Sequence, residues 1–487
     1  MKTVLIANRG EIAVRIVRTL RTMGIRSVVV YHAADAGTLA VREADEAREI
    51  AGATGVAAYL DGDAIIAAAR SAGADGIHPG YGFLAENAAF AEAVGKAGLR
   101  FIGPSPEVIR LLGDKIHARN RVREAGFPVT PSATDKGDER TFLDEARAVG
   151  FPLLVKAAAG GGGRGMRIVR TADALEGEIA TARREAERAF KDGRVYVERY
   201  VERPRHIEVQ ILSDTHGNHF HLGERECSVQ RRFQKIIEET PSPALSAEQR
   251  RNLCDTATGI ARAVGYTNAG TVEFIFAPNG DFFFLEVNTR LQVEHPVTEM
   301  VTGVDLVAEQ IRVARGEPIS FRQDDLRFQG SSIEVRICAE DPNAGHTPTT
   351  GEVALLRAPA GPGVRFDSGL CEGQPITTNF DSMLAKLIVH GSDRPQAIAR
   401  MRQALRDLVL LGIAHNGAYL ERILAHDGFA SGDIHTHFLD EQKAVLAVPE
   451  PTGKDLLALL SAAALAETGS AIDIPELYAS MGAWRNA

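Results

Sequence analysis

Two glutamates are expected to face each other in the segment VEFIFAPNGDFFFLEVNTRLQVEHPVTE, residues 272–299. Asn279-Gly280 is typical of a two-residue hairpin turn, because both central residues of such a turn need positive φ. Folding the strands about this turn pairs Glu273 with Glu286, with Cβ atoms about 5 Å apart. Like charges directly opposite each other are destabilising unless a positive charge lies between them. The pattern therefore predicts a hard divalent cation held by carboxylate oxygens.

After the second of these glutamates, a polar residue recurs at every second position: Glu286, Asn288, Arg290, Gln292 and Glu294. In an extended strand a period of two puts all these side chains on one face. The intervening residues suit packing against a core. A half-exposed hairpin with a charged outer face has the same alternation. The facing glutamates and the ordered acid, amide, arginine, amide, acid row favour the floor of an active site.

A glycine-rich stretch, FPLLVKAAAGGGGRGMRIVR, occupies residues 151–170. An apolar strand ends at Lys156, the glycines follow, and a second strand resumes at Met166. Glycine allows backbone amides to converge on phosphate oxygens. A P-loop would place its lysine after the glycines and continue into a helix. The pattern instead predicts a hairpin lid that closes over a nucleotide and excludes water, with a merely flexible linker as the alternative.

Size and composition describe an ordinary globular protein. The chain has 487 residues, 45% hydrophobic and 24% charged, which suggests about three domains. Its net charge of -9, with both signs interspersed, argues against nucleic acid or an anionic membrane as the main partner. The four cysteines show no paired or metal-binding spacing, and the start of the chain lacks the layout of a signal peptide. We therefore expect a reduced, cytoplasmic setting.

The elements that must position these residues fall into successive regions. Strands and helices alternate at first, which is typical of a parallel, doubly wound α/β sheet, although the first turn, NRGE, lacks the dinucleotide fingerprint. We expect domains at residues 1–110, 111–320 (with a small subdomain at about 131–201) and 330–445, and then a linker-like helical tail at 446–487. Ser246 and Gln249 form a capping box that predicts a helix.

Several other charged residues carry little signal by themselves. Lys115 follows a Gly-Asp pair in LLGDK, and Glu198 and His206 lie in VYVERYVERPRHIEVQ, where a solvated surface is the simpler interpretation. The segment ECSVQRRFQKIIEE is dense in basic and amide groups, as a polyanion site requires. Cys227 within it suits a buried, inert thiol better than a nucleophile.

Seven motifs in this order resemble the biotin carboxylases of the ATP-grasp superfamily: MKTVLIANRGEIAVRI, HPGYGFLAEN, LLGDK, GGGGRGM, ECSVQRR, EVNTRLQVEHPVTE and VRICAEDP. The resemblance covers roughly residues 1–445. It implies an N-terminal doubly wound α/β domain, a central ATP-grasp domain with a glycine-rich lid, and a C-terminal mixed α+β domain that contributes to the same cleft.

The resemblance also implies a role for individual positions. The residues that match ATP-binding positions are Lys115, Lys156, Gly161, Gly162, Gly163, Glu198, Arg199, Val201, His206 and Gln230. Glu273, Glu286 and Asn288 match ligands of Mg²⁺ (or Mn²⁺). Lys235, Arg290, Gln292, Val293 and Glu294 match a bicarbonate pocket, and Tyr81 and Arg336 match a biotin pocket. The catalytic set is then Glu294 as the base, Arg336 as the group that stabilises the biotin enolate, and Arg290 and Lys235.

The implied activity is the ATP- and bicarbonate-dependent carboxylation of biotin through carboxyphosphate. This is the first half-reaction of a biotin-dependent carboxylase, for which we expect an acyl-CoA acceptor. The chain has no Met-Lys-Met biotinylation site, so biotin is expected on a separate carrier protein or domain. The other expected partners are a second copy of the chain, in a homodimer, and a carboxyltransferase subunit.

Three departures from the family pattern stand out. Ala158-Ala159 precede the glycines, where the family usually has a small polar residue and a further glycine. Phe233 replaces the usual His or Asn and cannot donate a hydrogen bond, so no role is carried over to it. Thr22 and Pro362 replace residues of the dimer contact around Arg18 and Arg365.

Two alternative functions have the same general signature. One is a different ATP-grasp ligase that joins a carboxylate to an amine, against which the NTRLQVEHPVTE and VRICAEDP segments argue. The other is a catalytically silent paralogue that acts in assembly or regulation, although every chargeable catalytic position is intact.

Overall fold

The computed structural model describes residues 1–158, 166–449 and 452–469. It forms two compact units, residues 1–446 and residues 447–487. In the second unit the described residues include one helix, α18 (Gly453–Gly469). Among the described residues, none of the helices has the length and apolar character needed to cross a bilayer.

The chain begins with a parallel sheet in the order β3-β2-β1-β4-β5. Its strands are β1 (Thr3–Ile6), β2 (Arg26–Tyr31), β3 (Glu46–Glu49), β4 (Gly76–His78) and β5 (Arg100–Phe101), and the helices are α1 (Gly10–Thr22), η1 (Ala33–Asp35), α2 (Leu39–Glu43), α3 (Gly55–Tyr59), α4 (Gly62–Ser71) and α5 (Ala88–Lys96). Val4 and Ile6 pack into one apolar cluster and Leu5 into another. Burial on both faces explains the continuous apolar run of β1 and confirms the predicted doubly wound sheet.

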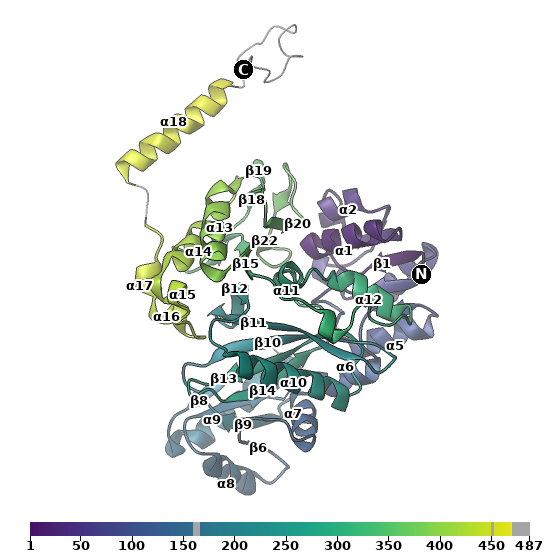
Figure 1. Ribbon diagram of the computed structural model, residues 1–487, viewed down its shortest axis with the longest axis vertical. Coiled ribbons are helices and arrows are strands. Elements are labelled where there is room, and N and C mark those ends of the chain that lie inside the picture. The colour runs from purple at the N-terminus through teal and green to yellow at the C-terminus, as the bar shows by residue number, and fades with distance from the viewer. Residues whose placement is uncertain (159–165, 450–451, 470–487) are drawn as a thin grey trace. The chain divides into compact units, whose positions relative to one another are not determined.

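An eight-stranded sheet in the order β14-β13-β10-β11-β12-β15-β22-β20 forms the middle of the first unit (Figure 1). The strands are β10 (Arg205–Ser213), β11 (His219–Arg231), β12 (Gln234–Thr240), β13 (Asn268–Phe276), β14 (Phe282–Asn288), β15 (Ser331–Cys338), β20 (Val364–Ser368) and β22 (Met383–Gly391). Because β12 pairs with β15, one sheet runs across the expected boundary between residues 320 and 330.

Helices surround this sheet: α6 (Pro106–Gly113), α7 (Lys115–Glu124), α10 (Ala247–Ala263), α11 (His295–Thr302), α12 (Leu306–Ala314) and η3 (Gln323–Asp325). The predicted capping box is confirmed, since the side chains of Ser246 and Gln249 each accept a hydrogen bond from the other's backbone N–H at the start of α10. Ile207, Val209 and Phe274 pack in the apolar core that also holds residues of α10. The alternate residues of the same strands therefore face away from this core.

A separate four-stranded sheet, β6-β9-β7-β8, builds the subdomain predicted around the glycines. Its elements are β6 (Ser132–Thr134), α8 (Glu139–Val149), β7 (Leu153–Ala157), β8 (Arg167–Val169), η2 (Ala172–Ala174), α9 (Leu175–Phe190) and β9 (Val195–Arg199). β7 and β8 pair antiparallel, as a hairpin requires. Phe142, Leu153 and Ile179 belong to an apolar core of this subdomain.

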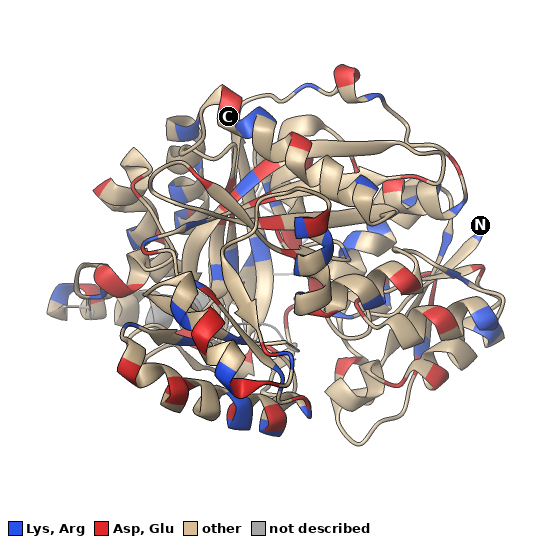
Figure 2. Cartoon of the chain, turned by 90° about the horizontal axis from the view of Figure 1, so that it is seen from below, with Lys and Arg blue, Asp and Glu red and all other residues tan. Residues whose placement is uncertain are grey.

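The last part of the first unit surrounds the far end of the eight-stranded sheet with short elements. These are β16 (Glu340–Asp341), β17 (Thr347–Pro348), β18 (Gly351–Glu352), β19 (Leu355–Arg357), β21 (Pro375–Ile376), β23 (Val409–Leu411), α13 (Arg394–Asp407), α14 (Gly417–Ala425), α15 (Asp427–Ser431), α16 (Phe438–Glu441) and α17 (Lys443–Leu446). Lysines and arginines are interspersed with acidic residues along the helices (Figure 2).

The β13–β14 hairpin corrects one prediction and confirms another. The two-residue turn is wrong: Ala277 N–H donates to Asp281 O, so three residues form the turn, and Gly280 has φ +92°. Glu273 nevertheless lies opposite Glu286, because an extra residue, Leu285, shifts the register between this pair and the next. One irregularity therefore compensates for the other.

The alternating polar row does not stay on one strand. β14 ends at Asn288, and Arg290 and Gln292 lie in the following loop. Glu294 is the residue immediately before α11. The strand stops where the chain turns toward a helix that has Pro296 in its first turn, a position that proline favours.

Candidate active site

The face of the eight-stranded sheet opposite α10 is lined by buried charged side chains. On β10 these are His206 and Glu208, and on the neighbouring β13 it is Glu273, which pairs with Glu208 in register. Glu198 and His206, which bare sequence reasoning assigned to solvated surface, are only 6% and 8% exposed. That interpretation is therefore wrong, because the residues are covered by elements distant in sequence.

Lys235 is the centre of this face. Its Nζ lies 2.5 Å from Glu208, 2.8 Å from Glu273 and 2.7 Å from Glu294. Burial alone would lower the pKa of Lys235, but the three carboxylates outweigh it and raise the pKa well above its usual range. The ammonium group is therefore permanently charged and ties three strands and the start of α11 together.

Glu294 lies between two cations. Its Oε1 accepts a hydrogen bond from Lys235 and its Oε2 accepts one from Arg336 at 3.0 Å. Burial would raise the pKa of Glu294, but Lys235, Arg336 and the nearby Arg225 hold it well below its usual range. In this state the carboxylate is ionised and a weak base.

Arg336 connects Glu294 to a deeper carboxyl. Its Nε donates to Glu238 Oε1 at 2.7 Å, and its Nη2 reaches Glu294. The side chain of Arg336 is 17% exposed, whereas that of Glu238 is fully buried. The guanidinium is therefore held from behind while one edge stays accessible to a substrate.

The predicted metal ligands lie next to each other. Glu273 accepts hydrogen bonds from Asn288 at 2.9 Å and Gln292 at 3.1 Å, and Glu286 lies 2.7 Å from Lys115 Nζ. Lys235 and His206 outweigh burial and hold the pKa of Glu273 well below its usual range. Two carboxylates and an amide are hard oxygen donors that suit Mg²⁺, and lysines balance both carboxylates here.

The loop after β14 orders the predicted bicarbonate residues. Arg290 donates to Glu86 at 2.9 Å, to Gln292 at 2.7 Å and to Asn288 at 3.2 Å. The carbonyl oxygen of Val293 accepts a hydrogen bond from the buried Lys386 at 2.8 Å. Arginine, amide and backbone groups therefore converge beside Glu294.

The predicted nucleotide residues form two groups. Lys156 and Arg119 both bind the carboxylate of Glu198, the latter at 3.2 Å. His206 Nε2 lies 3.0 Å from Glu273, and its Nδ1 lies 2.9 Å from Gln230 Nε2. The second group therefore contacts Glu273, one of the predicted metal ligands, directly.

The other predicted nucleotide residues lie on or near the lid. Arg199 ends β9, and its backbone N–H donates to Pro131 O at 2.8 Å. Val201 follows in the link to β10. The positions Gly161, Gly162 and Gly163, together with Ala159, fall outside the described residues.

Tyr81 approaches the site from the first domain. Its hydroxyl donates to Glu11, whose other oxygen lies 3.3 Å from Lys386 Nζ. Burial and the adjacent Glu11 raise the pKa of Tyr81 well above its usual range, so the phenol remains protonated. Lys386 thus connects Tyr81 with the Val293 carbonyl.

Sequence reasoning missed several residues that position the predicted ones: Glu11, Glu86, Arg119, Glu208, Arg225, Glu238 and Lys386. Some had a usable signal. Glu86 belongs to the HPGYGFLAEN motif, and Glu208 lies two residues after His206, on the same face of a strand. Lys386 is enclosed in an apolar strand, MLAKLIVHG, where a charge is unusual.

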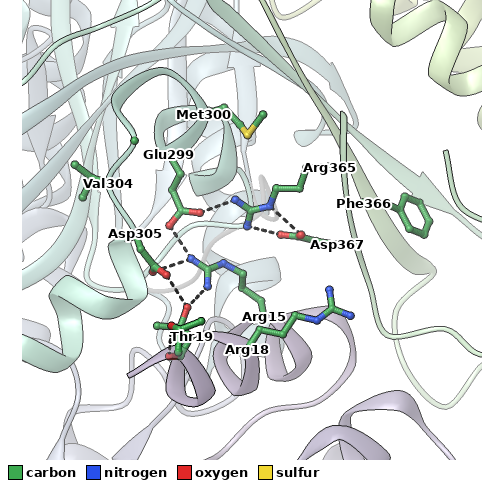
Figure 3. A pocket seen from close by; sticks show the side chains of 12 residues that line it. Arg15, Arg18, Thr19, Glu299, Met300, Val304, Asp305, Arg365, Phe366 and Asp367 are labelled. Carbon is green, nitrogen blue, oxygen red and sulfur yellow. Dashed lines mark hydrogen bonds and ion pairs between the residues drawn. The ribbon is translucent and has the colours of Figure 1, made fainter. Parts of the chain in front are cut away.

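A second cluster of charges surrounds a cavity of about 450 Å³ away from this face (Figure 3). Arg15 on α1 lies 2.8 Å from Glu299 and 2.9 Å from Asp305. Arg365 bridges Glu299 at 2.8 Å and Asp367 at 2.7 Å. Arg18 points away from this network and pairs with Glu43.

Three family models match the chain. Residues 1–109 match the biotin carboxylase N-terminal domain, residues 114–322 the ATP-binding domain of the carbamoyl-phosphate synthase L chain, and residues 334–441 the biotin carboxylase C-terminal domain. Together they span most of the first unit.

Curated relatives and solved structures match over nearly the same length. The biotin carboxylase of Haemophilus influenzae is 48% identical over 91% of this chain and 99% of its own length. Biotin carboxylase 1 of Bacillus subtilis is 47% identical over 90% of this chain and 98% of its own length. The biotin carboxylase domain dimer of Hydrogenobacter thermophilus 2-oxoglutarate carboxylase, solved with MgADP, ADP and bicarbonate, has a TM-score of 0.89 at 43% identity, over 92% of this chain and 99% of that one.

Proposed function

The chain belongs to the biotin carboxylase family, and from this premise we propose which of its residues carry out the ATP- and bicarbonate-dependent carboxylation of biotin. The observation that supports the assignment best is the position of Glu294 between Lys235 and Arg336. These three residues join the proposed metal and bicarbonate groups to the proposed biotin group.

In the proposed first step, Arg290, Lys235, Gln292 and the backbone at Val293 hold bicarbonate. Glu294 takes its proton, and a bicarbonate oxygen then attacks the γ-phosphorus of ATP, giving carboxyphosphate and ADP. Lys115, Lys156, His206 and Gln230 hold the nucleotide. Mg²⁺, held by Glu273, Glu286 and Asn288, screens the phosphate charges when bound.

The low pKa of Glu294 has a direct mechanistic consequence. A carboxylate that keeps hydrogen bonds from Lys235 and Arg336 is too weak a base for bicarbonate. Bicarbonate that accepts a hydrogen bond from Lys235 draws this cation away and raises the pKa of Glu294. We infer that the substrate itself activates the base.

In the proposed second step, carboxyphosphate breaks down to carbon dioxide and phosphate, and phosphate takes the ureido proton of biotin. The biotin nitrogen attacks carbon dioxide, and Arg336 stabilises the enolate oxygen while Tyr81 lines the pocket. Water would intercept carboxyphosphate, so closure of the lid over the site protects it.

Glu294→Gln tests this proposal. The variant is expected to lose bicarbonate-dependent ATP cleavage and to retain ATP binding, measured by calorimetry. Glu226→Gln is the matched control, because this buried carboxyl on β11 of the same sheet accepts a hydrogen bond from Ser242 and belongs to neither proposed step. Bicarbonate-dependent turnover that persists in Glu294→Gln would refute the assignment of the base.

For the partners, we propose a biotinylated carrier on another chain, an acyl-CoA acceptor and a carboxyltransferase subunit. The matched relatives differ in acceptor: one belongs to a 2-oxoglutarate carboxylase, and another is the α subunit of a methylcrotonoyl-CoA carboxylase from Dictyostelium discoideum, 43% identical over 95% of this chain and 66% of its own length. Purification of the biotinylated partner, followed by assays with acyl-CoA esters and pyruvate, distinguishes the acceptors. Four unpaired cysteines, all within the described residues, support a reducing, cytoplasmic location.

We further propose that the charge network around Arg15 and Arg365 forms the face of a homodimer. Its buried ion pairs open onto a cavity, and Arg18, 46% exposed, is available to a second copy. Arg18→Glu is expected to weaken the dimer in sedimentation experiments. Arg147→Glu on the lid, equally exposed at 47%, is the control that leaves the dimer intact.

A further inference from the structure

Two carboxyls that the proposed steps do not use lie opposite each other behind the active site. Glu238 on β12 and Glu334 on β15 are cross-strand partners in the register of the eight-stranded sheet, and both are 0% exposed. Such partners have Cβ atoms about 5 Å apart, and two like charges at this separation are destabilising. Two ionised carboxylates in this position would therefore oppose folding unless cations balanced both.

The cations nearby balance only one of them. Arg336 binds Glu238 Oε1 and Glu294, and Lys386, beside Arg336 on β22, binds the Val293 carbonyl and lies 3.3 Å from Glu11. Within the part of the chain that the structure describes, the remaining oxygen of Glu238 and both oxygens of Glu334 lack hydrogen-bond partners. A buried, unpaired carboxyl is stable in its neutral form.

Only some of the elements packed against the pair contribute ionisable groups to this balance. The ionisable groups that face it are Cys227 from β11, Lys235 from β12, Glu294 from the start of α11, Arg336 from β15 and Lys386 from β22. The charged residues of α13 and α14 pair elsewhere, Arg394 with Glu239 and Arg402 and Arg406 with Glu421. No further cation among the described residues therefore contacts Glu334.

Burial raises the pKa of both carboxyls, and it raises that of Glu334 further. Burial raises the pKa of Glu238 to about 7, against the opposing effect of Arg336. Burial also raises the pKa of Glu334 well above its usual range, since Lys386 and Arg336 compensate only in part. Above about pH 7 the cross-strand partners thus differ in charge, with Glu238 ionised and Glu334 protonated.

We propose that Glu238 and Glu334 are a positioning pair for biotin carboxylation, in which Glu334 keeps its proton and Glu238 is ionised, so that a single negative charge holds Arg336 toward the enolate oxygen of biotin. The inference rests on the proposed role of Arg336. Protonation of Glu238 releases the guanidinium toward Glu294. Ionisation of Glu334 adds a second anion that draws the guanidinium away from biotin. Both changes slow the biotin-dependent step.

The pH profile of biotin-dependent carboxylation tests the pair. The wild-type rate is expected to fall about tenfold per pH unit on an acid limb near pH 7 and on a separate alkaline limb. Glu238→Gln is expected to lose the acid limb and Glu334→Gln the alkaline limb, each varying less than about twofold over the same range. Glu239→Gln, the adjacent residue on β12, faces Arg394 and is expected to keep both limbs.

Infrared difference spectra of the wild-type protein give an independent readout that needs no variant to fold. A carbonyl band of a protonated carboxyl that disappears on the alkaline limb is expected in the wild-type protein and not in Glu334→Gln. The proposal is overturned if both limbs of the pH profile persist in both Gln variants, or if this band is absent from the wild-type protein. A wild-type protein without biotin-dependent carboxylation at any pH would instead overturn the proposed function.

Discussion

The four-stranded sheet of the lid and the eight-stranded sheet beside it are stabilised in different ways. The lid packs its helices over an apolar core that includes Phe142, Leu153 and Ile179. One face of the larger sheet instead holds buried carboxylates against lysines and arginines, with Lys235 in contact with three of them. The lid therefore depends on apolar packing, whereas the larger sheet depends on a balance of buried charges.

The largest effect is expected from removal of Lys235, the cation at the centre of the charged face of the larger sheet. Lys235→Met removes the cation that Glu208, Glu273 and Glu294 share, which costs about 3–5 kcal/mol of folding free energy. Bicarbonate-dependent ATP cleavage is expected to fall about a hundred- to a thousandfold. Urea unfolding and ATP cleavage assays measure both. Lys136→Met, which changes a side chain that is 77% exposed, is the control. Equal unfolding midpoints for Lys235→Met and wild type would show that the larger sheet does not depend on the charge of Lys235.

A cavity in the lid core is expected to act locally. Leu153→Ala removes a fully buried side chain from β7 and costs about 2–5 kcal/mol of lid stability. Hydrogen exchange is expected to accelerate in β6 to β9 while β10 and β13 stay protected, and the KM for ATP is expected to rise. Ile168→Ala, 42% exposed on β8, is the matched control. Equal loss of protection in both sheets would show that the lid is not an independent unit.

The larger sheet is expected to lose stability as pH rises from about 5 to about 7. The pKa of Glu238 is raised to about 7 in the folded state from about 4.3 in the unfolded chain, so the folded protein binds the extra proton in this window. The slope is at most about 1.4 kcal/mol per pH unit. Urea unfolding at several pH values measures it, and Glu238→Gln is expected to flatten it. An unchanged slope in this variant would contradict the raised pKa.

Glu273 and Glu294 change the pH dependence of folding stability in the direction opposite to Glu238. Their folded pKa values are well below that of an unfolded glutamate, so their stabilisation is present above about pH 4.3 and is lost as pH falls through the folded values. Urea unfolding measured at several pH values, extended below about pH 4, distinguishes the effect of Glu238 from that of Glu273 and Glu294.

The smallest effect is expected at the turn between β11 and β12. Arg232 and Phe233 have φ of +49° and +66°, a left-handed conformation that only glycine adopts without strain. Phe233→Gly is expected to stabilise the protein by about 1 kcal/mol in urea unfolding. Phe220→Gly on β11, where glycine weakens a strand, is the contrasting variant. Destabilisation by Phe233→Gly would show that the ring, 57% exposed, has a contact that stabilises the fold.

The sequence was a good guide wherever local pattern decides structure. The continuous apolar run of β1, the capping box of α10 and the pairing of Glu273 with Glu286 follow from periodicity and short-range chemistry, and the structure confirms them. The predicted two-residue turn was wrong, because the turn has three residues. The pairing of the glutamates was still right, because the bulge at Leu285 restores the register that the longer turn shifts.

Contacts between elements that are distant in the sequence could not be predicted from local sequence patterns. Glu198 and His206 look solvated from their own segment, but elements far away in sequence cover them. Glu238 lies in the segment singled out for its basic and amide groups, and Lys386 is an unusual charge in an apolar strand, but neither segment indicates that the two residues lie near each other. Their placement depends on β12 pairing with β15 and on β15 pairing with β22, which only the folded sheet reveals.

The continuity of the large sheet across β12 and β15 also fixes when the site can assemble during synthesis on the ribosome. Glu208 is made 178 residues before Lys386 (386 − 208), a delay of roughly 10–40 s at usual translation rates. Within this interval, until β15 is made, β12 lacks the strand that completes its edge, and Glu294 at the start of α11 lacks Arg336. The nascent chain must therefore shelter an open strand edge and unbalanced acids until its later strands emerge.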